Sequence, residues 1–225
     1  SRMLSMIYGF LQGKPIQHRT PAQLRWETDL ERTLTDEEWE GIFSRARTTA
    51  HSSSGKEAWA KLTHYWYYTP ARIHKWLPQR SERCWRGCGG TGTLVHLLWH
   101  CPKLMRYWDQ VLDELDGAFN TKVPRFPAYV LLGLPNKLIF PLNSRWDTQL
   151  AMALCAATQT ILASWGTDRI PDHTAWLHRL WRLLGLEKLS LAAESHGQDF
   201  NRLWVPLLSF LSNEFREVTC PRYLR

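Results

Sequence analysis

The stretch Cys84–Cys101, with the sequence CWRGCGGTGTLVHLLWHC, indicates most about how this chain folds. It holds four metal-ligand residues, Cys84, Cys88, His96 and Cys101, in the order C-x3-C-x7-H-x4-C. A tetrahedral zinc site takes about four nitrogen or sulfur ligands. The loop between the two ligand pairs is rich in glycine, which adopts positive φ without a steric cost and allows a tight turn around an ion. The stretch therefore predicts a structural zinc knuckle, because four protein ligands leave no open position for water.

Other arrangements of the same residues stay open. The cysteines could form a disulfide, although the chain has five cysteines, an odd number, and we recognise no secretory signal in it. They could also be buried free thiols beside a surface histidine. His100 could replace His96 or Cys101 as a ligand, although zinc favours the softer thiolate. Cys155 and Cys220 lie far from the motif and are interpreted as ordinary thiols.

The composition points to a globular protein with a basic surface. The chain has 225 residues, enough for one large or two small domains, and it carries a net charge of +7 and 13 tryptophans. This charge suits a nucleic-acid or anionic partner. No uninterrupted apolar run is long enough to cross a bilayer, so we expect no membrane partner. Reduced cysteines with zinc favour the cytosol or nucleus.

Helical patterns dominate the chain, and the alternation typical of strands is nowhere sustained. Thr35 and Glu38 form a capping box, Ser144 with Asp147 resembles a second one, and Asp172 is expected to cap a later helix. We predict a mostly α protein, an irregular helical domain with an embedded CCHC zinc knuckle and a C-terminal helical bundle. The expected segments are an N-terminal arm (1–23), a helical segment with the knuckle (24–117), a Pro-rich connector (118–143) and a C-terminal helical segment (144–225).

Three helix boundaries are predicted from proline and glycine, and two further elements from the apolar pattern and the knuckle. A helix over 57–68 should end before Pro70, and one over 103–115 should be closed by Gly117. A helix over 176–184 should break at Gly185. Residues 129–133 are expected to form a short buried strand or turn, and the knuckle's His96 is expected to begin a helix.

Several elements, taken in order, resemble a known family. They are Trp39-Glu40, Trp66-Tyr67-Tyr68-Thr69-Pro70, the Cys84–Cys101 motif, Leu131-Leu132-Gly133, Ile161-Leu162-Ala163-Ser164-Trp165, Ile170-Pro171, Trp176 and Leu186-Glu187-Lys188-Leu189. Together they are similar to the C-terminal part of the second open reading frame protein of vertebrate LINE (long interspersed element) retrotransposons, over roughly residues 24 to 190.

The resemblance implies a longer protein with an endonuclease and a reverse transcriptase, in a cytoplasmic ribonucleoprotein and in the nucleus. No (Tyr/Phe)-x-Asp-Asp polymerase signature occurs in these residues. For this region the resemblance implies binding of the element's own RNA, and of target DNA, in support of target-primed reverse transcription. The reverse transcriptase domain of the same polypeptide is a further expected partner, and the region itself is expected to have no catalytic activity.

Cationic and aromatic side chains lie close to the motif in the sequence. Arg and Lys contact phosphates, and aromatic rings stack on unpaired bases. The candidate nucleic-acid-binding residues are Tyr67, Tyr68, Arg72, His74, Lys75, Arg80, Arg83, Arg86, Lys103 and Arg106. Trp66 and Trp85 are interpreted as core residues because aromatic side chains bury large areas.

Two other functions are weighed against nucleic-acid binding. Some retroelements place a zinc motif before a restriction-like nuclease, and Pro171-Asp172 with Glu187-Lys188 could supply carboxylates for Mg²⁺. The tryptophan-rich helices could alternatively form a scaffold that contacts the polymerase or host proteins.

Overall fold

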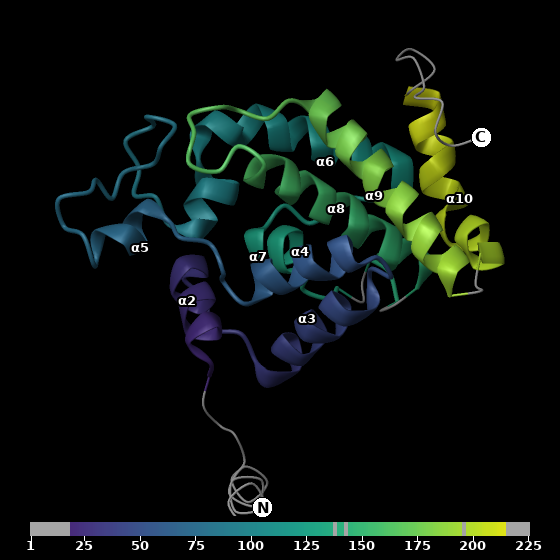
Figure 1. The fold of residues 1–225 in the computed structure, drawn as a ribbon, viewed down its shortest axis with the longest axis horizontal. Helices are drawn as coiled ribbons and strands as arrows, with labels where there is room; N and C mark the ends of the chain where they lie inside the picture. Colours follow the sequence, from purple (N-terminus) through teal and green to yellow (C-terminus); the bar gives the residue numbers. More distant parts are fainter. Residues whose placement is uncertain (1–18, 137–138, 142–143, 195–196, 215–225) are drawn as a thin grey trace, which may run out of the picture.

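The computed structural model describes residues 19–136, 139–141, 144–194 and 197–214, and these are mostly helical (Figure 1). The elements are α2 (Pro21–Leu30), α3 (Asp36–Thr48), α4 (Ser53–Thr63), α5 (Pro70–His74), the π-helix η1 (His96–His100), the 3-10 helix η2 (Pro102–Leu104), α6 (Met105–Phe119), α7 (Pro127–Leu132), α8 (Arg145–Leu162), α9 (His173–Ala193) and α10 (Gly197–Glu214). Within these ranges β structure is limited to one bridge between Arg83 and Thr91. The predicted mostly α fold is confirmed.

Helix α8 lies at the centre of a helical body (Figure 1). It contacts α4, α6, α7, α9 and α10, and most of its residues are buried. Its alanines, among them Ala153, Ala156 and Ala157, are fully buried, and their small side chains let neighbouring helices approach closely. One apolar core runs from Trp26 to Leu207, so it includes side chains from both sides of the predicted connector.

The predicted N-caps fit the helix starts. Thr35 accepts from the Glu38 amide and the Glu38 side chain returns to the Thr35 amide, which completes the capping box. Asp172 accepts from the Ala175 amide at the start of α9. Ser144 caps α8, but Asp147 does not close a box there, because its carboxylate pairs with Arg45 in the interior.

Three predicted boundaries inside the body are wrong. Helix α9 continues through Gly185, because packing against α8 and α10 outweighs a glycine cost of about 1 kcal/mol. Helix α6 passes Gly117 and ends at Phe119, and its C-cap Asn120 takes the left-handed conformation with φ 46°. Residues 127–132 form α7, neither strand nor turn, and Gly133 ends it with φ 63°.

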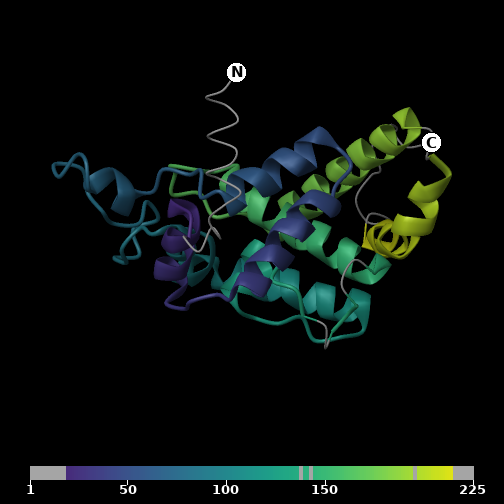
Figure 2. The same ribbon diagram turned by 90° about the horizontal axis from the view of Figure 1, so that it is seen from below.

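Residues 66–92, here called the finger, project from the body (Figures 1 and 2). The predicted helix over 57–68 instead ends at Thr63, because Tyr65 adopts φ 51° and turns the chain out of the helix. The finger holds α5, which Thr69 caps by accepting from the Arg72 amide. The segment then returns to the body through η1.

Two predictions fall on other parts of the chain. The N-terminal arm over 1–23 lies mostly outside the described residues, although α2 already begins at Pro21. Cys220 also lies outside them, whereas Cys155 is a buried free thiol in α8. No helix in the described ranges combines the length and apolar character needed to span a membrane.

Candidate metal centre

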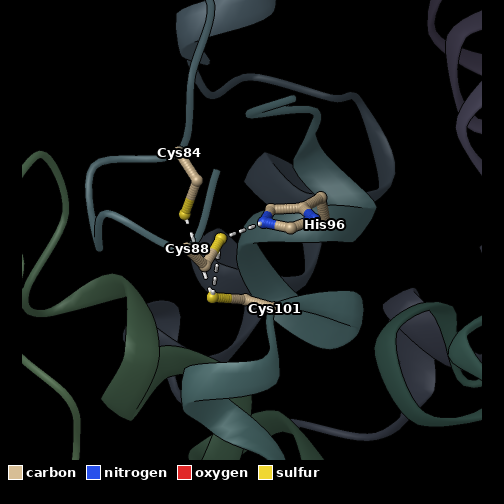
Figure 3. Close-up of side chains that lie close together, drawn as sticks. All are labelled: Cys84, Cys88, His96 and Cys101. Carbon is tan, nitrogen blue, oxygen red and sulfur yellow. Dashed lines mark hydrogen bonds between the residues drawn. The ribbon is translucent and has the colours of Figure 1, made fainter. Parts of the chain in front are cut away.

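Four side chains converge where the finger meets the body (Figure 3). The ligand atoms of Cys84, Cys88, His96 and Cys101 all lie within 4.8 Å of one another. The Sγ atoms of Cys84 and Cys101 are 3.8 Å apart, and those of Cys88 and Cys101 are 3.7 Å apart. The Cys88 Sγ lies 3.2 Å from His96 Nε2. This group can bind a metal ion.

Cys84 and Cys88 lie on a turn in the C-terminal part of the finger, where the chain returns to the body. The Cys84 amide donates to the Gly90 carbonyl at 2.9 Å, and the Gly87 amide donates to the Cys84 carbonyl at 3.1 Å. Gly87 and Gly89 take φ values of 65° and 82°, which are strained for residues with a Cβ. These two glycines turn the backbone so that the thiols of the turn face the same point.

Gly90 is required for a different reason. A Cβ at this position would lie 2.5 Å from Cε1 of His96, closer than real carbon atoms approach. The absence of a side chain therefore lets the turn close directly on the imidazole ring.

The second two ligands come from the body. The helix expected to begin at His96 is a single π-helical turn, and the Cys101 amide donates to the His96 carbonyl at 2.9 Å. Leu97 and Leu98 on this turn are fully buried in the core. A metal held by all four ligands would therefore join the projecting turn to a segment anchored in the body.

Arg86 ties the same two segments together. Its Nη1 donates to the Leu97 carbonyl at 2.8 Å, and the side chain is buried. This contact satisfies a carbonyl group of the π-helical turn. Arg86 lies inside the structure and is not on the surface with the other predicted nucleic-acid-binding cations.

The protonation of the ligands varies with their surroundings. Burial raises the pKa of the Cys84 thiol to about 12. Burial also acts on Cys88, but the Gly90 amide and the neighbouring thiols outweigh it and bring the pKa below its usual value. Burial, followed by the charges of His100 and Arg86, lowers the pKa of His96 and favours the neutral imidazole that ligates metals.

This geometry bears on two alternatives for the motif, a disulfide between its cysteines and His100 as a ligand. The sulfur atoms lie well beyond the bonding distance of about 2.0 Å for a disulfide. Cys84, Cys88, Cys101 and Cys155 are all free thiols. His100 is exposed and is not part of the converging group, which leaves His96 as the histidine ligand.

The predicted nucleic-acid-binding residues differ in their accessibility. The exposed ones are Tyr68, Lys75, Arg80, Arg83, Lys103 and Arg106. Tyr67, Arg72 and His74 are half-buried. Tyr67 packs on Trp165 with ring centroids 5.3 Å apart, and burial raises its pKa to about 12.

Two exposed tryptophans were missed by sequence reasoning. The interpretation of Trp66 as a core residue is wrong, because 65% of it is exposed, and Trp76 is 58% exposed. Trp85 does pack inward, against Trp165 with centroids 4.9 Å apart. The signal available in the sequence was the run of four aromatic residues, 65–68, which cannot all face one core.

The two carboxylates considered for a nuclease do not converge. Asp172 caps the first turn of α9, whereas Glu187 lies fifteen residues further along the same helix, roughly 20 Å away. Glu187 is fully buried and accepts from the amides of His51 and Ser52 at 2.7 and 2.9 Å. It therefore supports the start of α4 and faces no shared metal site with Asp172. No protein-family model matches the chain.

Proposed function

We propose that this chain is a zinc-stabilised nucleic-acid-binding module without catalytic activity of its own. Its role would correspond to the one implied by the resemblance to LINE C-terminal regions, with RNA of the element and target DNA as ligands during target-primed reverse transcription. The observation that supports it most directly is the convergence of four metal-ligand side chains at the base of a basic, exposed finger.

The dimensions of the group favour zinc as the metal. A tetrahedral site with Zn–S bonds of about 2.3 Å has sulfur atoms about 3.8 Å apart at its corners. The separations of 3.8 Å between the Cys84 and Cys101 sulfurs and of 3.7 Å between the Cys88 and Cys101 sulfurs match this edge. Three thiolates and one imidazole also suit zinc better than magnesium or calcium, which prefer oxygen ligands.

The charge of the finger supports an anionic ligand. Residues 66–92 contain five Lys or Arg and one acidic residue, Glu82. Lys75, Arg80 and Arg83 are exposed, and Lys103 and Arg106 add exposed cations just beyond the ligand Cys101. Cations spread along an exposed element provide the phosphate contacts through which most non-specific nucleic-acid affinity arises.

Zinc would support nucleic-acid binding by holding the cations of the finger in a fixed position relative to the body. Two of its ligands belong to the finger and two to a turn rooted in the core. Loss of the metal would leave Arg80 and Arg83 on a segment without a fixed relation to Lys103 and Arg106.

The test is a salt-titrated binding series with single-stranded and double-stranded RNA and DNA. The expected result is affinity that falls steeply with salt, a bound zinc measured by native mass spectrometry, and loss of both in Cys88→Ser. The matched control, Cys155→Ser, changes a cysteine outside the group and should keep zinc and binding.

Two charge-reversal variants distinguish binding by the cations of the finger from binding caused by the net positive charge of the protein. Arg80→Glu with Arg83→Glu should weaken binding at least about 10-fold and reduce the salt dependence. Arg182→Glu with Lys188→Glu changes the same charge on exposed positions of α9 and should have a much smaller effect. Equal losses in both pairs, or no salt-dependent binding by the zinc-loaded protein, would contradict the proposal and favour a protein-binding scaffold.

A further inference from the structure

We infer that the finger binds unpaired bases, by stacking them on Trp66, Tyr68 and Trp76. This inference rests on the proposed function, and it assigns single-stranded nucleic acid as the ligand class and names the stacking rings. None of the three side chains is needed for the core, since 65%, 54% and 58% of them, respectively, are exposed.

The chain between α4 and α5 exposes two of these rings. Exposure alternates from residue to residue, with Tyr65 and Thr69 buried, Tyr67 half-buried, and Trp66 and Tyr68 exposed. Such alternation is typical of an extended chain, in which residues two apart face the same way. Tyr67 fixes this arrangement by packing against Trp165 of the body. The Trp165 Nε1 also donates to the Tyr68 carbonyl at 3.2 Å.

The third ring comes from the end of α5 and meets the second. Tyr68 and Trp76 lie edge to face, with centroids 5.7 Å apart. The Arg72 guanidinium carbon lies 4.6 Å from the Tyr68 centroid and 5.3 Å from the Trp76 centroid. This cation contacts both rings of the pair, while more than half of each residue stays exposed to solvent.

The positive charge around the exposed rings favours a nucleic acid over an apolar protein as the ligand of this surface. An apolar protein partner would be expected to meet a largely apolar surround. Here Leu77 is the exposed large aliphatic side chain beside the rings, and the same finger exposes three cations, Lys75, Arg80 and Arg83. The combination of open aromatic faces with phosphate-binding cations is the one that single-stranded nucleic-acid sites use. Paired bases present no free face to such rings, so a duplex would contact only the cations.

The test compares strands with and without bases. The probes are a fluorescently labelled single strand, a strand of the same length made of abasic sites, and a duplex of the same length. The zinc-loaded protein should bind the base-bearing strand at least about 10-fold more tightly than the abasic strand. Trp66→Ala with Trp76→Ala should remove this preference and leave affinity for the abasic strand within about 2-fold.

A ring-retaining control keeps the result interpretable. Trp66→Phe with Trp76→Phe preserves aromatic faces and should retain most of the preference for bases, with unchanged zinc content. Equal binding of base-bearing and abasic strands by the unmodified protein overturns the stacking inference and leaves the proposed function standing. An equal loss for both strands in the alanine pair also overturns it, because the rings would then be structural. Absence of salt-dependent binding to any probe overturns the proposed function itself.

Discussion

The finger and the helical body use the same residue type in opposite ways. Trp26, Trp59 and Trp176 are almost completely buried between the helices. Trp66 and Trp76 stand on the finger with most of their surface in solvent. The difference shows that the tryptophans of this chain occupy two environments, the packed interior and an exposed surface.

The two regions also differ in what holds them. Among residues 66–92, the buried ones are Thr69, Pro70, Cys84, Arg86 and Gly92, so the finger buries no large apolar side chain. Its order comes from caps and backbone contacts, from the contacts of Tyr67, Trp85 and Arg86 with the body, and from the group of four ligand residues to which Cys84 and Cys88 belong. The body, in contrast, is stabilised by a large apolar core and a small second cluster of Trp59, Ala151 and Cys155. The finger is therefore expected to depend on metal and the body to be largely independent of it.

Metal removal is the sharpest way to test this difference, and it has the largest expected effect. Structural zinc contributes a binding free energy on the order of 10 kcal/mol in small zinc domains. Chelation should therefore abolish amide-exchange protection over residues 80–92 of the finger while α8 and α9 stay protected. Hydrogen exchange with mass spectrometry measures both regions in one experiment. Simultaneous loss of protection in α8 would show that the body also depends on the metal.

A substitution in the body should produce the reverse pattern. Arg45 and Asp147 form an ion pair at 2.6 Å with side chains 3% and 5% exposed. Arg45→Met leaves Asp147 charged and buried without this partner, which should cost about 3–5 kcal/mol in the free energy of unfolding measured with urea. Zinc content should not change.

Two controls make the ion-pair result specific. Arg182→Met removes an exposed arginine of α9 and should change stability by less than about 0.5 kcal/mol. Arg45→Met combined with Asp147→Leu removes both charges and should recover much of the loss. A double variant as unstable as Arg45→Met would show that packing, and not the isolated charge, causes the effect.

The sequence predicted the features that depend on local chemistry. The ligand set follows from residue type and spacing, and it is the set that converges in the structure. The Thr35 capping box and the Asp172 cap were predictable because the bonds involved join residues three apart. The mostly α fold follows from the helical spacing of apolar residues.

Features set by distant contacts were not predictable. Asp147 has the spacing of a capping-box residue, but Arg45, 102 residues away in sequence, recruits it into the interior. Trp66 has a large apolar side chain of the kind usually found in a core, yet the turn at Tyr65 directs it to solvent. Gly185 is a helix breaker locally, and the packing of α9 against two neighbours overrides that preference.

Glycine offers the finest comparison of the two regions, with small effects of opposite sign. Ala at position 90 would place Cβ 2.5 Å from the His96 ring, and a ring bound to metal cannot move away freely. Gly90→Ala should therefore weaken zinc binding by about 1–3 kcal/mol, measured by chelator competition.

Ala at position 185 would meet nothing within 4 Å, and it lies inside α9. Gly185→Ala should raise the free energy of unfolding by about 0.5–1 kcal/mol and leave zinc affinity unchanged. Loss of zinc affinity in Gly185→Ala would show that the finger and the body are not stabilised separately, whereas unchanged zinc affinity in Gly90→Ala would show that the turn tolerates a Cβ beside His96.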